Sequence, residues 1–234
     1  MRKEMLCVEG LNAWYGESHV LHGIGFHVNE GELVTLLGRN GAGRSSTLRA
    51  IMGIGCTRKG SIRVQGHETT GLKPHHIARL GIGYCPEERG IYASLNVEEN
   101  LLLLPQVGPG GMTLTEIYQM FPNLYERRKS QGTKLSGGEQ QMLAMARILR
   151  TGAKLLLLDE ITEGLAPVVV EMLGKVLTEL KTRGYTIVLV EQNFRFSAPL
   201  ADRNYVVEHG NIVATVAYGE LEKNRTLIEN YLGV

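Results

Sequence analysis

A glycine-rich segment contains the first group of residues whose types and spacing could do chemistry. Gly38 and Gly43 enclose four residues and are followed by Arg44 and Ser45, which matches the phosphate-binding pattern G-x-x-x-x-G-K-[ST] except at the lysine. In such loops, glycines let backbone N–H groups face phosphate oxygens, the helix that follows adds partial positive charge, and the hydroxyl, here that of Ser45, ligates Mg²⁺. The alternative is an ordinary glycine-rich turn between a strand and a helix.

Arg44 stands where this pattern has lysine. Arginine keeps the positive charge, but its planar guanidinium is larger than the compact ammonium that the loop normally surrounds. We therefore expect phosphate binding to survive and hydrolysis to be slower than in an Arg44→Lys variant.

Two short apolar runs end in side chains that can accept protons or hydrogen-bond a ligand. Residues 155–158 are four leucines followed by Asp159 and Glu160, and residues 186–190 are followed by Glu191 and Gln192. Continuous apolar runs of this length are typical of parallel strands covered on both faces. The alternative for Asp159 and Glu160 is a solvated strand end.

A third segment, residues 135–141, contains two consecutive glycines at the start of an expected helix. Ser136 and Glu139 have the spacing of a capping box, which is the simpler interpretation. Gly137 and Gly138, however, each lower helix stability by about 1 kcal/mol relative to alanine. They are explained if another surface, such as a phosphate, approaches the backbone closely.

The elements that position these residues are predicted to form an α/β core. A strand over 33–37 precedes the glycine loop, and a helix over 45–52 follows it and ends at Gly53. Apolar residues at helical spacing lie behind Pro167, and Gly184 closes that segment, which predicts a crossover helix and a βαβ unit.

The remaining segments are predicted to add a β portion and a helical insertion. Residues 6–28 and 61–66 indicate short strands with turns, and residues 205–216 indicate a hairpin centred on His209-Gly210-Asn211. Between residues 87 and 151 the strand pattern is missing. Helices are expected there over 97–104, 116–121 and 138–150, with Pro122 as a separator.

Composition excludes several classes of protein. The chain has 234 residues, of which 43% are apolar and 21% charged, with a net charge of +1, so disorder, coiled coil and a basic nucleic-acid surface are not expected. The apolar runs are far shorter than the roughly 20 residues that cross a bilayer. A cytoplasmic chain with three reduced cysteines, Cys7, Cys56 and Cys85, is therefore expected.

Taken together, these motifs resemble those of the ATP-binding subunits of ABC transporters, most of all the LivF type of branched-chain amino acid importers. The family resemblance rests on residues 38–46, on the signature 135–140, and on 155–160 as Walker B. The LivF-type resemblance rests on Tyr84-Cys85-Pro86-Glu87, Arg89-Gly90-Ile91, Val97-Glu98-Glu99-Asn100-Leu101, Gly164-Leu165-Ala166-Pro167 and Val190-Glu191-Gln192-Asn193.

The resemblance implies one ABC nucleotide-binding domain over 1–234. Its RecA-like α/β P-loop ATPase core, with an N-terminal antiparallel β portion, would comprise 1–86 and 153–234, and an inserted α-helical subdomain would comprise 87–152. It also implies ATP and Mg²⁺ as ligands, with two such subunits facing each other so that each signature serves the partner's nucleotide.

The resemblance further assigns roles to individual residues. Asp159 and Ser45 would hold Mg²⁺, Glu160 would deprotonate the attacking water, and Tyr15, which follows Trp14, would stack on adenine. The phosphate-loop residues in contact with the nucleotide would be Gly38, Asn40, Gly41, Ala42, Gly43, Arg44, Ser45 and Ser46. The signature residues would be Ser136, Gly137, Gly138 and Glu139.

Three positions differ from the broad superfamily. Glu87 takes the place of the Q-loop glutamine and could approach Mg²⁺, and Gln192 takes the place of the switch histidine, where it can hydrogen-bond phosphate but cannot titrate. Both substitutions suit the LivF type. The alternative is that Glu87 and Gln192 are ordinary polar residues of surface loops. Ile161 replaces the proline that follows the Asp-Glu pair, which we expect to loosen the turn.

The implied function is ATP hydrolysis that drives import of branched-chain or related amino acids at the cytoplasmic face of the inner membrane. The implied partners are a second ATPase subunit, identical or not, two membrane-spanning permease subunits and, indirectly, an extracytoplasmic solute-binding protein. The alternatives are a subunit that binds nucleotide but hydrolyses it weakly, an importer of urea or short amides, and a soluble ABC ATPase acting on DNA or ribosomes.

Overall fold

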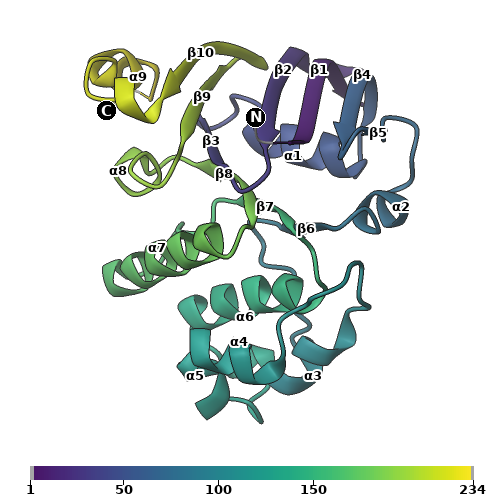
Figure 1. The fold of residues 1–234 in the computed structure, drawn as a ribbon, viewed down its shortest axis with the longest axis vertical. Coiled ribbons are helices and arrows are strands. Elements are labelled where there is room, and N and C mark those ends of the chain that lie inside the picture. Colours follow the sequence, from purple (N-terminus) through teal and green to yellow (C-terminus); the bar gives the residue numbers. More distant parts are fainter. Residues whose placement is uncertain (1–2, 233–234) are drawn as a thin grey trace.

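The computed structural model describes residues 3–232, and a six-stranded sheet at its centre contains the strand ends identified above (Figure 1). The strand order is β10-β9-β3-β8-β7-β6. Its strands are β3 (Leu33–Leu37), β6 (Ile82–Cys85), β7 (Leu155–Asp159), β8 (Thr186–Glu191), β9 (Arg203–Glu208) and β10 (Asn211–Ala217). All neighbouring pairs are parallel except β9 and β10, which form the expected hairpin. Every residue of β3, β7 and β8 is buried, which confirms the predicted covered parallel sheet.

A second, four-stranded antiparallel sheet forms the N-terminal β portion. Its order is β2-β1-β4-β5, from strands β1 (Glu4–Tyr15), β2 (Ser18–Asn29), β4 (Thr57–Val64) and β5 (His67–Glu68). The strands β1 and β2 are longer than the short strands expected, because register shifts along their pairing bend them without interrupting it.

The two faces of the parallel sheet bury two separate cores. Leu155 and Leu157 pack with the antiparallel sheet and with helix α1 (Arg44–Met52), whereas Leu156 and Leu158 pack with α6 (Gly137–Arg150) and α7 (Pro167–Thr182). Successive residues of a strand point to opposite faces, so the four leucines divide between the two cores. This burial fixes the ends of β3, β7 and β8 relative to α1.

The chain between β6 and β7 folds into helices that lie beyond one face of the parallel sheet, at the bottom of Figure 1. They are α3 (Val97–Leu103), α4 (Leu114–Met120), α5 (Pro122–Glu126), the short 3₁₀ helix η1 (Gly132–Lys134) and α6. The helices expected over 97–104, 116–121 and 138–150 are confirmed within a few residues. Pro122 separates two helices as expected, and it is also the first residue of α5. Proline suits this position because the first N–H groups of a helix have no partner within the helix.

Several short elements were not predicted. They are β6, α2 (Pro74–Ala78), α8 (Phe194–Ser197), the 3₁₀ helix η2 (Tyr218–Glu220) and α9 (Arg225–Leu232). Cys7, Cys56 and Cys85 are all free thiols. Within residues 3–232, no helix has the length and apolar content needed to span a membrane.

Candidate functional site

The glycine loop between β3 and α1 is shaped by packing as well as by conformation. A Cβ on Gly38 would lie 2.3 Å from the Val207 carbonyl oxygen, and Gly43 has a φ of 107° and no room for a Cβ beside Leu21. Helix α1 starts at Arg44 without a side-chain cap and without an acidic residue in its first turn. Its first N–H groups and its partial positive charge are therefore available to an anion.

A cavity of about 340 Å³ lies over this loop. It is lined by Val20, Asn40, Gly41, Ala42, Gly43, Arg44, Ser45, Ser46, Glu87, Glu160, Glu163 and Gln192. The fold thus brings the ends of β3, β7 and β8 and Glu87, two residues after β6, to one place. Most of the predicted phosphate-loop residues, together with Glu87, Glu160 and Gln192, line this one cavity.

Arg44 is buried beside Glu160. Its Nη2 donates to Glu160 Oε1 at 2.7 Å and lies 3.3 Å from Asn40 Oδ1. The side chains of Arg44 and Glu160 are only 3% and 9% exposed, so this is a buried ion pair. The second terminal nitrogen, Nη1, is buried and has no hydrogen-bond partner. A buried guanidinium nitrogen without a partner is energetically unfavourable, and an acceptor such as an anion would satisfy it.

Asp159 is held at the end of β7 by two hydroxyls. Ser45 Oγ donates to its Oδ1 at 2.8 Å, and Tyr84 Oη donates to its Oδ2 at 3.3 Å. Asp159 is fully buried, which excludes the solvated strand end considered above. Burial raises the pKa of Asp159 to about 6, against the lowering effect of the Ser45 hydroxyl. Tyr84 was part of a motif but was not predicted as a site residue.

Glu160 is positioned by strand β8 as well as by its own strand. Its N–H donates to the Val190 carbonyl at 2.9 Å, and Gln192 Nε2 lies 3.1 Å from its Oε2. Glu160 has a φ of 46°, in the left-handed region that side chains other than glycine seldom adopt. Burial raises the pKa of Glu160, as does a hydrogen bond with Glu163, while Arg44 opposes the increase.

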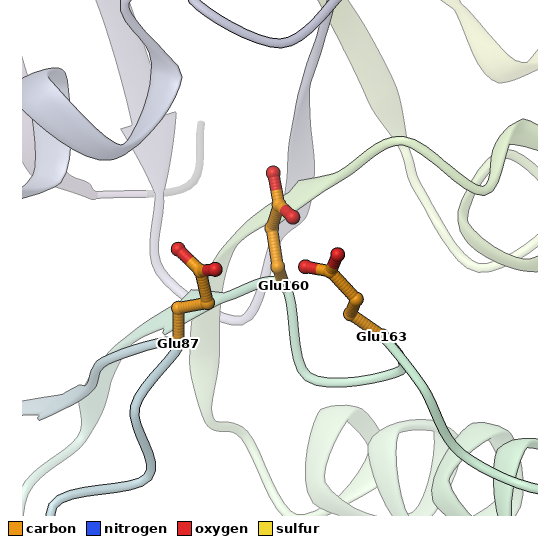
Figure 2. A group of neighbouring side chains, drawn as sticks. All are labelled: Glu87, Glu160 and Glu163. Atoms are coloured by element: carbon orange, nitrogen blue, oxygen red, sulfur yellow. The ribbon is translucent and has the colours of Figure 1, made fainter.

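Three carboxylates gather at the mouth of this cavity. Figure 2 shows Glu87, Glu160 and Glu163 pointing toward a common space, and one oxygen of each lies within 4.8 Å of the others. Glu163 was missed by sequence reasoning, although it follows Glu160 in the same turn. Glu87 and Glu163 are exposed, whereas Glu160 is buried.

The signature residues lie outside this cavity. Ser136 and Glu139 form the expected capping box at the start of α6, with Glu139 N donating to Ser136 Oγ and Ser136 N donating to Glu139 Oε2. The surfaces that approach the two glycines belong to this chain. A Cβ on Gly137 would lie 3.3 Å from the Arg89 guanidinium, and one on Gly138 would lie 3.0 Å from Val169. Close packing within the chain therefore favours glycine at both positions.

Two other sequence expectations concern positions at the edge of the site. Tyr15 ends β1, opposite Ser18, and is not among the residues that line the cavity. Trp14 stacks on His19, with ring centroids 4.4 Å apart. Ile161 is completely buried in the core on the α6–α7 face of the sheet. The isoleucine that replaces proline is therefore anchored by its side chain.

This chain resembles known proteins in sequence and in structure. A family model described as "ABC transporter" matches residues 21–163, which is more than half of the chain. The chain is 39% identical to the high-affinity branched-chain amino acid transport ATP-binding protein BraG of Pseudomonas aeruginosa, over 98% of this chain and 100% of that protein. It is 32% identical to a probable branched-chain amino acid transport ATP-binding protein LivF of Archaeoglobus fulgidus, over 98% and 99%. It is also 32% identical to the lipopolysaccharide export ATP-binding protein LptB of Haemophilus influenzae, over 98% and 97%.

Solved structures share the whole fold. The structure of an ATP-binding subunit of an ABC transporter superposes with a TM-score of 0.80 at 25% identity, over 98% of this chain and 100% of that one. A dimeric ATP-binding cassette bound to ADP and phosphate superposes with a TM-score of 0.80 at 21% identity, over 92% and 99%. These likenesses confirm the predicted α/β architecture.

Proposed function

The chain belongs to the ABC transporter family, and from this premise we propose that it hydrolyses ATP to drive import of branched-chain or related amino acids. The identity of 39% with BraG along almost the entire chain supports this class of solute. The geometric observation that carries the ATPase proposal is the cavity over the glycine loop, which is lined by the start of α1 and by Arg44, whose buried Nη1 has no partner.

The residues present fit the phosphates of ATP. Helix α1 offers uncapped N–H groups, Gly41 and Gly43 expose loop backbone to the cavity, and Arg44 Nη1 offers a charged donor. We propose that a phosphate oxygen of ATP becomes the partner of Arg44 Nη1. Arg44 Nη2 can keep its contact with Glu160 at the same time, because a guanidinium has two terminal nitrogens.

The donor set also fits Mg²⁺, which prefers oxygen ligands. Ser45 Oγ and the Asp159 carboxylate already touch and would hold the ion, with Glu87 near enough to approach it across the mouth of the cavity. When bound, Mg²⁺ would neutralise charge on the β- and γ-phosphates. The raised pKa of Asp159 reflects a buried carboxylate whose charge is stabilised chiefly by hydroxyl hydrogen bonds, and a cation would remove that cost.

Glu160 is proposed to act as the general base. The oxygen of a water molecule would attack the γ-phosphorus, the bond to the β-phosphate oxygen would break, and the proton of the water would pass to Glu160. Oε2 is the better acceptor, because Oε1 is held by Arg44 at 2.7 Å. Gln192, which lies 3.1 Å from Oε2, would orient this carboxylate and the water beside it. The products are ADP and inorganic phosphate.

A second subunit is proposed to complete the site. Ser136, Gly137, Gly138 and Glu139 do not line this chain's cavity, so they are free to serve the nucleotide of a facing subunit. Tyr15 is proposed to meet the adenine ring beside Val20, the residue of β2 that lines the cavity. We propose that the helical region, residues 87–152, contacts two permease subunits at the cytoplasmic face of the membrane.

Weak hydrolysis is a second candidate, favoured by the Arg44–Glu160 ion pair. An arginine that holds the base lowers its basicity, so this subunit would bind ATP tightly and turn it over slowly. Phosphate release by purified protein at saturating Mg-ATP, compared with Glu160→Gln, separates the two candidates. If the substitution changes nothing while ATP still binds, the enzyme proposal is wrong.

The transported solute requires a separate experiment. The chain would be reconstituted in proteoliposomes with its permease subunits and solute-binding protein, and uptake of labelled leucine would be compared with uptake of urea and a short amide. ATP-dependent leucine uptake is the expected result. Uptake of urea or the amide alone would overturn the proposed solute class, and the 32% identity with LptB makes lipopolysaccharide the further comparison.

A further inference from the structure

Strand β8 ends in a carboxylate that the proposed reaction does not use. Glu191 is 2% exposed, and both of its oxygens accept hydrogen bonds from one residue of another strand end. Thr162 N donates to Oε1 at 3.0 Å, and Thr162 Oγ1 donates to Oε2 at 2.9 Å. Thr162 is itself buried. A buried carboxylate with both oxygens used in this way makes a charge-assisted, geometrically specific contact.

Thr162 belongs to the turn that carries Glu160. The left-handed backbone of Glu160, with a φ of 46°, is a strained conformation that persists only where the surrounding structure imposes it. Proline is absent at position 161, so the ring that would restrict this turn is missing. The turn is held instead by β8, through the Glu160 N–H to Val190 O bond of 2.9 Å and the two bonds from Thr162 to Glu191.

We propose that Glu191 is a positioning residue for hydrolysis: its carboxylate fixes the turn after β7 through Thr162 and thereby aims Glu160 at the attacking water. The proposal rests on the proposed ATPase function. Gln192, the next residue, reaches Glu160 Oε2 from the same strand end. One end of β8 therefore controls both the backbone and the side chain of the base.

The chemistry of the contact favours a carboxylate. Both Thr162 groups are used as donors, and an ionised carboxylate offers two acceptors and no donor. In Glu191→Gln one oxygen becomes an NH₂ group, so the negative charge is lost and the Thr162 hydroxyl must turn from donating to accepting, which weakens the contact. Burial raises the pKa of Glu191 to about 7, so kinetics are best measured at pH 8, where the carboxylate is largely ionised.

The test compares Glu191→Gln and Thr162→Val with the conservative variant Thr162→Ser in the full chain, assembled with its partner subunits. Displacement of a catalytic group by about 1 Å can lower rates by about a hundredfold. We expect kcat to fall at least about tenfold in Glu191→Gln and Thr162→Val, with KM and Kd for ATP unchanged within about twofold. Thr162→Ser keeps both donors and should retain wild-type kcat.

Coupling distinguishes positioning from a general loss of structure. The double variant Glu191→Gln, Thr162→Val should be less impaired than the product of the two single defects predicts, because both substitutions disturb the bond between the Thr162 hydroxyl and Glu191. The proposal would be overturned if the loss of kcat in the double variant equalled the product of the two single losses. A kcat in Glu191→Gln equal to that of wild type would also overturn it. A loss of kcat in Thr162→Ser as large as in Thr162→Val would also overturn it, as would a rise in KM that accounts for the whole effect.

Wild type and Glu160→Gln are measured in the same series. If they release phosphate equally, the proposed enzyme function fails, whatever Glu191 does. If wild type is active and Glu160→Gln is not, a normal Glu191→Gln enzyme refutes the positioning role alone. If Glu191→Gln does not fold, Thr162→Val and Thr162→Ser still decide the question, because valine matches threonine in shape and lacks only the hydroxyl donor.

Discussion

Arg44→Lys is the substitution that tests the site most directly. In the structure, Arg44 Nη2 donates to Glu160 Oε1 at 2.7 Å, and the pair is buried with exposures of 3% and 9%. Arginine can hold Glu160 with one nitrogen while the other, now without a partner, binds phosphate. Lysine has a single nitrogen, which would engage the phosphate and release the carboxylate.

The size of the effect follows from this hydrogen bond. A hydrogen bond to a charged group contributes about 1.5–3 kcal/mol, and each 1.36 kcal/mol removed from a barrier raises the rate tenfold. If holding Glu160 lowers its reactivity by most of that energy, Arg44→Lys should raise kcat by about tenfold to a hundredfold. The Kd for ATP should change much less, because both side chains keep one charged donor for the phosphate.

The assay is phosphate release at saturating Mg-ATP by the assembled transporter, with Kd measured separately by calorimetry. Arg183→Lys serves as the control, because Arg183 pairs with Glu179 on the surface at the end of α7 and lies outside the cavity. That control should behave as wild type. Equal turnover in wild type and Arg44→Lys would refute the reasoning, as would slower turnover in the lysine variant.

Three further predictions follow from other contacts. Glu160→Gln should lower phosphate release at least about a hundredfold and lengthen the lifetime of an ATP-bound dimer, which size-exclusion chromatography measures; a dimer as short-lived as that of wild type would contradict the assignment of the base. Arg89 stabilises the signature segment, because its Nη1 donates to Gln140 at 2.9 Å and its guanidinium packs on Gly137. Arg89→Ala should weaken ATP-driven dimerisation and leave ATP binding to the monomer unchanged by calorimetry, and an equal loss of both would contradict this role. Without ATP or Mg²⁺, Asp159 keeps its proton in the folded state up to about pH 6, whereas the unfolded chain releases it near the ordinary value of 3.8. The folded state therefore binds more protons between these values, so this group destabilises the fold as the pH rises from about 4 to 6, by an amount of order 2–3 kcal/mol. Urea unfolding should show Asp159→Asn gaining stability over wild type as the pH rises from 4.5 to 7.5, and a constant difference would contradict the raised pKa.

Much of the site was predictable because it lies at strand ends. The apolar runs of β3, β7 and β8 indicate parallel strands, and the carboxyl ends of parallel strands meet at one edge of a sheet. That rule brings the glycine loop, Glu160 and Gln192 together before any coordinates are known. The hairpin of β9 and β10 was predictable for a similar local reason, since its turn residues lie between two strand patterns.

Other features could not be predicted, because they depend on contacts between distant segments. The environment of Gly137 is set by Arg89, which arrives from the other end of the helical region, and Gly138 is packed by Val169 of α7. The strand β6 has only four residues, too few for a clear pattern, and is defined by its pairing with β7. Whether Tyr15 or a neighbour meets the adenine depends on the bend of β1 and β2, which register shifts determine.

The sequence by itself determined the glycine loop, the order of the main strands and helices and the types of groups at the strand ends, because each depends on local conformation and on burial patterns along the chain. Only the tertiary structure decided which of those groups touch. Arg44 pairs with Glu160, 116 residues away in sequence, and Thr162 bonds to Glu191, 29 residues away. The packing of β3, β7 and β8 decides which side chains lie next to these buried charges. No local sequence pattern specifies those neighbours.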